Sequence, residues 1–336
     1  MFRLQSQCVT LNLSPENCRT DASVQSQCDK ERYMTERRQT KRCPVCDDGQ
    51  EYYFHYAEYD YYRCSSCGLV STLPVPTEAE IEAHYRRKFE QGNYSLLLRY
   101  RDEYRTVYKT FVNVLEHGLK KKGTTLQGKR ILDIGCFTGD LLLLLSEKGA
   151  DVYGLELQSE AVALANDLLP GRIYQADVYG TSFPRMQFDI ITFTGLIEHL
   201  VEPVKLVRRV YELLAPGGLA LLQTPDSGSL PAKLLQKYWP PYMPVEHIHL
   251  FTRKSIAVLL EQNNFTGLAF KRHIKKLPLS YVYQMFQNFG PEFYRLLTPL
   301  YRVCPSRLKA MSLPFYGGEM IATAWKAEAP LAKRDY

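Results

Sequence analysis

The stretch RILDIGCFTGD, residues 130–140, decides the fold. An apolar run leads into a turn that contains Gly135 and Gly139, and a leucine-rich segment follows directly. This order is typical of a buried strand that passes through a tight turn into a helix, which is the repeating unit of parallel α/β sheets. The turn is not the phosphate-binding pattern G-x-G-x-x-G, because Phe137 and Asp140 stand where its second and third glycines would fall.

Downstream of this stretch, apolar strands and helical segments alternate. We predict strands at residues 129–135, 151–157, 172–178, 188–196 and 217–225, and helices at residues 139–149, 159–169 and 202–214. Short apolar strands separated by helices of this length predict an α/β fold with a parallel sheet and helices on both faces. The last apolar stretch, GGEMIATAWK (317–326), is predicted as the edge strand.

Three carboxylates follow consecutive strands of this predicted sheet: Asp133, Glu156 and Asp177. The carboxyl ends of parallel strands meet at one rim, where α/β proteins bind ligands. Asp133 would repel a phosphate, whereas an acidic rim attracts a ligand with an ammonium and a sulfonium group, such as S-adenosylmethionine. There, Glu156 would accept hydrogen bonds from both ribose hydroxyls and Asp177 one from the adenine amino group. Taken singly, each acid also fits a helix cap or a solvated charge.

The segment CPVCDDGQEYYFHYAEYDYYRCSSCG, residues 43–68, contains two C-x2-C pairs. Cys43 and Cys46 are separated from Cys64 and Cys67 by 17 residues. Each pair places two thiolates at one tight turn, and two such turns at the end of a tyrosine-rich hairpin form a closed set of four ligands for structural zinc. Such a metal stabilises the fold and does not activate water. The alternative is four unrelated buried or redox cysteines.

The rest of the chain is organised around these two units. We expect a flexible tail at residues 1–40, a zinc ribbon at 41–76, a helical linker and cap at 77–125, and the α/β domain at 126–336. Within that domain, an aromatic insert at about 228–248 and C-terminal helices at about 277–317 are predicted to cap the pocket of a second substrate, the acceptor. The alternative is that their aromatic residues only pack the last helices on the sheet.

Composition limits the class of protein. The 336 residues are 45% hydrophobic, which is enough for a real core, and the formal charge of +6 is spread along the chain. Nucleic acid is therefore not the expected partner. No stretch reaches the roughly 20 apolar residues of a membrane span, and the first residues lack the apolar core of a signal peptide. We expect a cytoplasmic protein with reduced thiols.

The segments ILDIGCFTGDLL, VYGLE, YQADV and FDIITFTGLIEHLVEPVKLVRRVYELLAPGGLALLQTPD, with EHIHLFTRKSIAVLLEQNNF, resemble class I S-adenosylmethionine-dependent methyltransferases. The chain is similar to the UbiG-like branch, and to members with an N-terminal zinc-binding module that often act on sugars or other small acceptors. The resemblance covers residues 43–325. It implies a seven-stranded, doubly wound Rossmann-like sheet, with S-adenosylmethionine and structural zinc as cofactors.

The resemblance also assigns roles to residues. Those it implies for binding the cofactor are Asp133, Gly135, Gly139, Glu156 and Asp177. The position of Phe137 is usually glycine in these enzymes, so that Phe137 either packs on the first helix or walls the methionine end of the pocket.

Two Glu-His pairs are candidates for catalysis. Glu246 and His247 match a pair beside the acceptor in zinc-module sugar methyltransferases, and His247 is our preferred general base, although Pro244 replaces the tyrosine of the sugar pattern. The other pair contains His199. In some UbiG-like enzymes a pair like it joins an earlier acid to hold a divalent metal, but Gly195 offers no carboxylate, so a second metal is not expected.

These observations predict methyl transfer to a small-molecule acceptor, such as a sugar, a quinone or phenol, or a lipid-linked intermediate, by in-line displacement. Two alternatives remain open. One is an RNA methyltransferase that uses the zinc ribbon to hold RNA. The other is a non-catalytic binding protein with a methyltransferase fold, which the substitution at Phe137 would favour.

Overall fold

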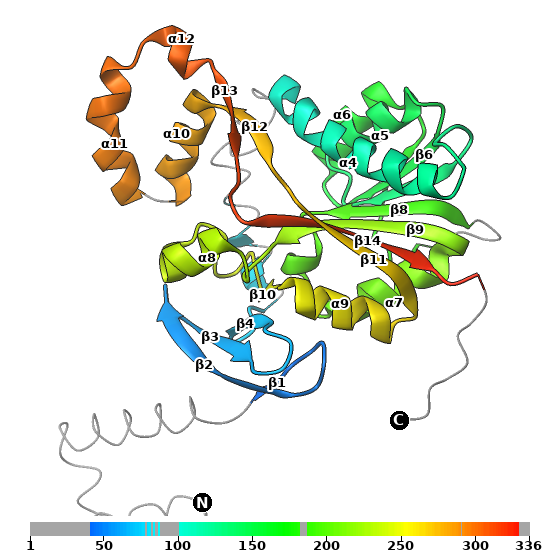
Figure 1. Cartoon of the computed structure of the whole chain (residues 1–336), viewed down its shortest axis with the longest axis horizontal. Coiled ribbons are helices and arrows are strands. Elements are labelled where there is room, and N and C mark those ends of the chain that lie inside the picture. Colours follow the sequence, from blue (N-terminus) through cyan, green and yellow to red (C-terminus); the bar gives the residue numbers. More distant parts are fainter. Residues whose placement is uncertain are drawn as a thin grey trace, which may run out of the picture.

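A computed structural model describes residues 41–77, 79–81, 83–84, 87, 101–181, 187–289 and 291–328. The predicted tail, residues 1–40, lies outside the described residues, as does much of the linker before residue 101. The described strands form a five-stranded sheet, a central seven-stranded sheet and a two-stranded ribbon (Figure 1). Among the described helices, none combines the length and the apolar character that crossing a membrane requires.

The central sheet has the order β11-β14-β9-β8-β5-β6-β7. Five of its strands run parallel and match the predicted alternation: β5 (Arg130–Ile134), β6 (Asp151–Glu156), β7 (Ile173–Gln175), β8 (Phe188–Thr194) and β9 (Leu214–Pro225). The strand β14 (Glu319–Lys326) is antiparallel to β9. The sheet is therefore mixed, with its parallel strands at the centre and at one edge.

The prediction that residues 317–326 form the edge strand is wrong. The strand β14 lies between β9 and β11 (Phe265–Arg272), and β11 is the edge. The burial of side chains explains this order. Ile321 packs on one face of the sheet while Met320 and Ala322 pack on the other, as an inner strand requires. In contrast, β11 buries only its first residue fully and contains an irregularity near Gly267, which is typical of an edge.

Helices cover both faces of the central sheet, as predicted (Figure 1). The helices α4 (Arg101–Lys121), α5 (Asp140–Ser146) and α6 (Ser159–Leu168) share one apolar core. On the opposite face, α7 (Pro203–Leu213) and α9 (Arg253–Gln262) share the other. This is the doubly wound α/β architecture, and its ligand sites belong at the carboxyl ends of the parallel strands.

The cysteine-rich segment forms a small sheet that joins the main domain. Its strands are β1 (Lys41–Arg42), β2 (Gly49–Tyr56), β3 (Tyr59–Cys64) and β4 (Val70–Leu73), and β2 with β3 is the predicted tyrosine-rich hairpin. The fifth strand, β10 (His249–Leu250), comes from the main domain and pairs with β4. Because the buried cysteines belong to the same core as α9, the two units pack as one body.

Two accessory segments lie on the side of the sheet where the parallel strands end. The insert after β9 contains α8 (Leu230–Leu235) and a 3-10 turn, η4 (Gln236–Tyr238), and another 3-10 turn, η3 (Ile197–His199), follows β8. The C-terminal helices are α10 (Leu279–Phe289), α11 (Pro291–Val303) and α12 (Ser306–Lys309). Figure 1 shows them projecting away from the sheet, to which β12 (Lys275–Pro278) and β13 (Ser312–Phe315) connect them.

Candidate functional site

The turn between β5 and α5 is a left-handed loop. Gly135 and Gly139 have φ angles of 73° and 74°, and Phe137 has a φ of 48°. A Cβ atom at Gly139 would lie 3.2 Å from the Cβ of Ala165, so that glycine there lets the loop approach α6. Phe137 adopts a conformation that glycine would adopt more easily, which fits the glycine that the family resemblance predicts at this position.

Glu156, at the end of β6, binds the backbone around the loop. Its Oε2 accepts a hydrogen bond from the Phe137 amide at 2.9 Å. Its Oε1 accepts from the amides of Leu157 and Gln158, at 2.7 and 3.0 Å. The carboxylate therefore connects the glycine loop to the beginning of α6, and three of its roughly four acceptor positions are used.

Asp133 lies beneath this loop rather than on an open rim. Its side chain is buried, and its Oδ1 accepts a hydrogen bond from the Thr192 hydroxyl on β8 at 2.6 Å. Burial raises the pKa of the Asp133 carboxyl to about 7, while the bond from Thr192 opposes that rise and the charge of Glu156 adds to it. A positively charged ligand nearby would favour the ionised form of this group.

Asp177 is exposed and lies two residues beyond β7. The amide of Ala176 donates to the carbonyl of Glu156 at 3.1 Å, which places Asp177 next to the end of β6. Its own Oδ1 accepts from the Tyr179 amide at 3.2 Å. The structure thus places the three predicted acids at the ends of adjacent strands, with Asp133 and Glu156 electrostatically coupled beside the loop.

Arg101, on the first turn of α4, is a site residue that the sequence analysis missed. Its Nε donates to Asp140 Oδ1 at 2.6 Å, and the Thr138 hydroxyl donates to Oδ2 of the same carboxylate at 2.6 Å. Arg101 Nη2 is buried and has no hydrogen-bond partner among the described residues. A carboxylate, such as that of a bound amino-acid moiety, would satisfy this donor. No local pattern marks Arg101, because Asp140 lies 39 residues away.

A partly buried ionic cluster lies at the same end of the sheet, where β14 begins. Glu319 accepts from Lys275 Nζ at 2.6 Å, from His273 Nδ1 at 3.0 Å and from Gln223 Nε2 at 2.9 Å. Burial alone would raise the pKa of Glu319, but Lys275 and His273 lower it to about 2. Lys275 and Glu319 therefore form an ionised pair in a partly buried environment.

Two histidines and a glutamate converge where the turn after β8 meets the end of the insert. Glu198, His199 and His247 each offer one ligand atom, and these three atoms lie within 4.8 Å of one another. The centroids of the two imidazole rings are 4.9 Å apart. Glu198 is buried and accepts from the Thr224 hydroxyl at 2.9 Å. Burial raises the pKa of its carboxyl to about 7. Together these groups have the donor set of a divalent-cation site.

Backbone carbonyls fix the tautomer of both histidines. His199 Nδ1 donates to the Glu246 carbonyl at 2.9 Å, and His247 Nδ1 donates to the Pro241 carbonyl at 2.7 Å. A ring whose Nδ1 carries the proton presents Nε2 as an acceptor or a metal ligand. The Gly195 position offers no carboxylate, as the sequence showed, but His247 reaches Glu198 and His199 from the insert instead.

The adjacent Glu246 contacts a residue from a distant segment of the chain. Its carboxylate Oε1 lies 2.9 Å from His84 Nε2, which comes from the segment before α4. Glu246 therefore connects the insert to the linker through its side chain and holds His199 through its carbonyl. His84 is a second residue that the sequence analysis missed.

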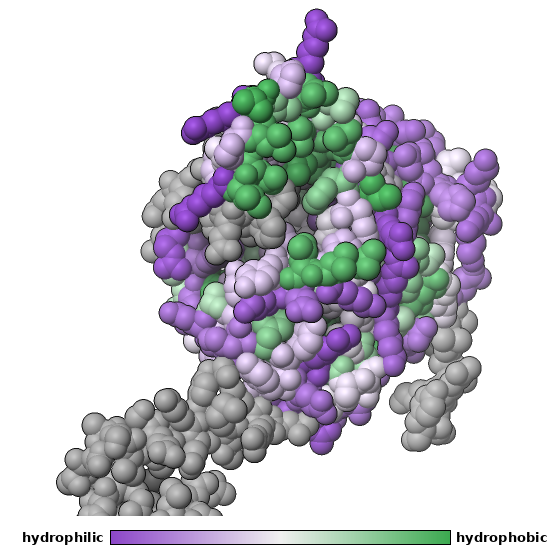
Figure 2. Space-filling view, turned by 60° about the vertical axis from the view of Figure 1, so that its left-hand side comes forward, coloured by the Kyte–Doolittle hydropathy of each residue, from purple (hydrophilic) through white to green (hydrophobic). Residues whose placement is uncertain are grey.

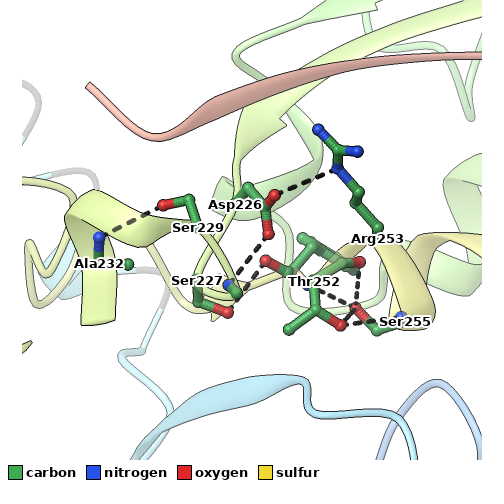
Figure 3. A network of polar contacts seen from close by, with 9 residues as sticks. Asp226, Ser227, Ser229, Ala232, Thr252, Arg253 and Ser255 are labelled. Atoms are coloured by element: carbon green, nitrogen blue, oxygen red, sulfur yellow. Dashed lines mark hydrogen bonds and ion pairs between the residues drawn. The ribbon is translucent and has the colours of Figure 1, made fainter. Parts of the chain in front are cut away.

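A polar network holds the two ends of the insert together (Figure 3). Asp226, after β9, accepts from the Gly228 amide at 3.0 Å and lies 3.5 Å from Arg253 Nε. The Ser229 hydroxyl caps α8 by accepting from the Ala232 amide at 3.3 Å. At the other end, Thr252 and Ser255 form a capping box on α9. The insert is thus clamped at its base, which positions Glu246 and His247.

The four cysteines of the N-terminal sheet meet as predicted. Cys43 Sγ lies 3.6 Å from Cys67 Sγ, and Cys46 Sγ lies 3.4 Å from Cys64 Sγ. Zinc bonded at about 2.3 Å to four sulfurs in a tetrahedron requires sulfur separations of roughly 3.8 Å, which is close to these values. The contact with Cys67 lowers the pKa of the Cys43 thiol to about 5. The set fits a closed metal site.

A cavity of about 830 Å³ lies apart from these groups. It is bounded by Pro44 of the cysteine-rich sheet, by Tyr179 and by Lys205, Arg208 and Arg209 of α7. None of the predicted cofactor-binding or catalytic residues lines it. Its mixed charges and its position on the outer side of α7 do not match the switch point of the sheet, so we do not assign the substrate to it.

Comparisons with known proteins agree with this architecture. A family model described as a methyltransferase domain matches residues 100–270. The ubiquinone biosynthesis O-methyltransferase of Psychrobacter arcticus is 32% identical over 108 residues, which are 30% of this chain and 42% of that protein. The protein of the same name from Pseudomonas aeruginosa is 33% identical over 106 residues, 30% of this chain and 45% of that protein. The alignments thus span less than half the length of these curated relatives.

Among solved structures, the chain is similar to magnesium protoporphyrin IX methyltransferase from Synechocystis PCC 6803, with 16% identity and a TM-score of 0.48. That match covers 73% of this chain and 100% of the other. The family model spans just over half of the chain, from α4 through the glycine loop and the parallel strands to β11. The chain therefore belongs to the methyltransferase-domain family, with curated relatives in the ubiquinone O-methyltransferase branch.

Proposed function

We propose that this chain transfers a methyl group from S-adenosylmethionine to a hydroxyl group of a small phenolic or quinol acceptor. The family to which it belongs supports methyl transfer, and the curated relatives, which are named O-methyltransferases of ubiquinone biosynthesis, support this acceptor class. Sugars and lipid-linked intermediates are the other acceptors that the sequence leaves open.

The donor would be held by the loop between β5 and α5 and by the acids around it. The proposed contacts are from Asp133, Gly135, Gly139, Glu156 and Asp177, with Arg101 for the carboxylate of the methionine moiety. When bound, the sulfonium supplies an electrophilic methyl group. Glu156 retains about one acceptor position, so one ribose hydroxyl can bind without displacing a backbone amide, and the second requires the Phe137 amide to release its bond.

The observation that carries the proposal on the acceptor side is the pair of oriented imidazoles. Backbone carbonyls hold the Nδ1 protons of His199 and His247, so Nε2 is the unprotonated nitrogen of each ring and has the chemistry of a base for an acceptor hydroxyl. His247, on the insert, is the proposed general base, and His199 and Glu246 position it. Loss of a proton is needed for oxygen methylation, so a base fits an O-methyltransferase better than an enzyme that methylates neutral nitrogen.

The same residues support a second role for this cluster. Glu198, His199 and His247 would hold a divalent cation, which would supply Lewis-acid stabilisation of a deprotonated acceptor oxygen. In that case the two imidazoles orient the acceptor through the ion and do not take its proton. Dependence of turnover on added Mg²⁺ or Zn²⁺, and its loss with a chelator that leaves the cysteine site loaded, would distinguish the two roles.

The position of the cysteine-rich sheet argues against the RNA alternative. Cys43, Cys64 and Cys67 pack into the core of the main domain, and β4 pairs with β10. A module that packs in this way has a structural role in the main domain, and that role does not require RNA. The non-catalytic alternative makes a different prediction: the protein should bind the cofactor but transfer no methyl group.

Calorimetry with S-adenosylmethionine and S-adenosylhomocysteine tests the donor site. We expect saturable binding to the full chain, and the Glu156→Gln variant should bind at least about tenfold more weakly because a charged hydrogen-bond acceptor is lost. The matched control is Glu160→Gln, an exposed glutamate four residues away whose substitution should leave the affinity unchanged. The absence of binding by the unmodified protein would refute the proposal.

Transfer of a labelled methyl group tests the acceptor class. The full chain is incubated with labelled donor and, in parallel, a catechol such as 3,4-dihydroxybenzoate, a nucleotide sugar, and total RNA. We expect label in the catechol, released as an O-methyl ether. Label confined to RNA would support the alternative of an RNA methyltransferase, and retained cofactor binding without transfer to any acceptor would support a binding protein.

A further inference from the structure

The helix α11 has an apolar stripe that is exposed in the described part of the structure. One of its faces packs on α10, where the Tyr301 ring stacks on Tyr283 at 3.7 Å and Thr298 bonds to the same tyrosine at 2.8 Å. On another face, Leu296, Leu300 and Val303 recur at intervals of four and three residues. Their exposed fractions are 74%, 69% and 78%, which is unusual for three neighbouring aliphatic side chains on one helix.

The apolar surface continues onto neighbouring elements. Leu308, Met311 and Leu313, in and after α12, are 46%, 46% and 42% exposed. On α8 and η4, Leu230, Leu234 and Tyr238 are 66%, 73% and 57% exposed. Figure 2 shows both groups on one side of the molecule, with a large hydrophobic patch over α11 and α12 and a smaller one over α8 below it. We call these two patches together the α8–α11 face.

The charged residues beside these patches are mostly basic. Arg295 and Arg302 lie seven residues apart, on the same flank of the stripe on α11, and both are exposed. Exposed Lys233 and Lys237 alternate with the leucines around α8. Residues 279–318 contain three arginines, one lysine and a single acidic residue, and residues 230–238 contain no acidic residue. The whole chain has 42 basic and 36 acidic residues, so the excess of basic residues in these two segments is local.

We propose that the α8–α11 face docks on the surface of an anionic phospholipid bilayer. An apolar stripe bordered by arginine and lysine is the pattern of a helix that lies in the interface of a membrane, with its aliphatic side chains among the acyl chains and its cations at the lipid phosphates. A protein partner with an apolar surface would fit the leucines but would not explain the excess of cations. The inference does not depend on the proposed chemistry.

The two patches make the attachment two-point. The helix α11 has 13 residues and α8 has six, so neither can span a bilayer, and each contributes only a shallow insertion. Single weak insertions give reversible binding, whereas two elements on one rigid face bind together. Attachment should therefore be peripheral, salt-sensitive and dependent on both patches.

Sedimentation of the full chain with vesicles tests the proposal. The vesicles are phosphatidylcholine alone or phosphatidylcholine mixed with phosphatidylglycerol, at low and at physiological salt. We expect binding to the mixed vesicles, with little binding to the neutral ones and weaker binding as salt rises. The double variant Leu296→Gln with Leu300→Gln should bind the mixed vesicles at least roughly tenfold more weakly than the unmodified chain. The double variant Arg295→Gln with Arg302→Gln should lose roughly fivefold in affinity for the mixed vesicles for each charge removed.

Matched variants on other surfaces test whether the loss of vesicle binding is specific to the α8–α11 face. Leu164→Gln removes an exposed leucine from α6, and Lys120→Gln with Lys121→Gln removes two exposed charges from the end of α4. Both should bind the mixed vesicles as the unmodified chain does. Because all the substituted side chains are exposed, unchanged circular dichroism and thermal unfolding will show that each variant is folded.

Three results would overturn the proposal. The first is equal binding to neutral and anionic vesicles, and the second is binding that the α11 variants leave unchanged. The third is that the unmodified chain does not bind vesicles and instead forms a concentration-dependent dimer, measured by light scattering, that the Leu296→Gln and Leu300→Gln variant abolishes. That outcome would assign the α8–α11 face to a second copy of the chain.

Discussion

Asp133 links the stability of the protein to pH. Burial raises the pKa of its carboxyl from 3.8 to about 7. The folded state therefore holds this proton up to about pH 7, whereas the unfolded chain releases it near pH 4. The stabilisation from the bound proton is complete below about pH 4 and is lost as the pH rises through 7. Titration of Asp133 thus lowers the free energy of unfolding across this window.

We predict that Asp133→Asn reduces this pH dependence. Asparagine keeps an oxygen that can accept the Thr192 hydroxyl but does not titrate. Thermal unfolding measured from pH 5 to pH 8 should show a smaller fall in Tm for the variant than for the unmodified chain. The control is Asp167→Asn, an exposed position on α6, whose Tm profile should follow the unmodified chain. Parallel profiles for Asp133→Asn and the unmodified chain would contradict the assignment.

His247 is the residue on which the proposed chemistry depends most. We predict that His247→Gln lowers the rate of methyl transfer by roughly 100-fold or more, since general-base catalysis contributes about that much. The affinity for the methyl donor should change less than about twofold, because His247 belongs to the acceptor side. The control is His117→Gln, an exposed position on α4. Equal losses in turnover and in donor affinity would indicate a structural role for His247 instead.

Thr252 is the residue through which α9, the insert and the cysteine-rich sheet meet. Its hydroxyl donates to the Cys67 carbonyl at 2.8 Å and accepts from the Ser255 amide at 3.0 Å, while its own amide donates to Ser255 Oγ at 2.8 Å. The beginning of α9 therefore carries a helix cap, which Figure 3 shows, and also a contact with the cysteine-rich sheet.

We predict that Thr252→Ala lowers the free energy of unfolding by about 1–2 kcal/mol, because it removes the cap and leaves the Cys67 carbonyl without its donor. Thr252→Ser keeps the hydroxyl and should recover most of the loss. Thr106→Ala, at an exposed position inside α4, should be neutral or slightly stabilising because alanine favours a helix. Denaturant unfolding measures all three variants, and equal loss in the serine and alanine variants would count against the cap.

The elements that the sequence predicted well are those with local patterns. The parallel strands β5 to β9 are short apolar runs between helices, and their order along the chain suffices to place their ends on one rim. The order of β11 and β14 has no such local signal. Both strands are antiparallel partners at one side of the sheet, and only the burial of both faces of β14 places it inside.

The same distinction applies to the candidate site. The loop glycines, Glu156 and the four cysteines follow from motifs within a few residues or from regular spacing. The contact of His84 with Glu246 joins residues 162 positions apart, and that of Arg101 with Asp140 joins residues 39 positions apart. Convergence of this kind depends on how distant segments pack, so a single sequence contains no pattern that predicts it.

The cysteine-rich sheet and the methyltransferase domain share one hydrophobic core. Three of the four cysteines and Leu69 belong to the core that also contains Leu259 and Ile256 of α9. The strand β10 completes the small sheet, and the insert that carries Glu246 and His247 ends where β10 begins. A metal bound by the four thiolates therefore stabilises residues of the candidate site, although it has no open position for chemistry.

We predict that removing this metal destabilises the whole chain and not only its N-terminal sheet. Purified, reduced protein should contain about one zinc per cysteine set, and loss of a structural ion should lower Tm by roughly 10 °C or more. Differential scanning calorimetry after chelation, or of Cys64→Ser, should show a single transition shifted down, because the shared core makes the units unfold together. Cys304→Ser, outside the cluster, should leave the transition in place. A main transition that keeps its temperature in zinc-free protein would show that the core tolerates an unfolded cysteine-rich sheet.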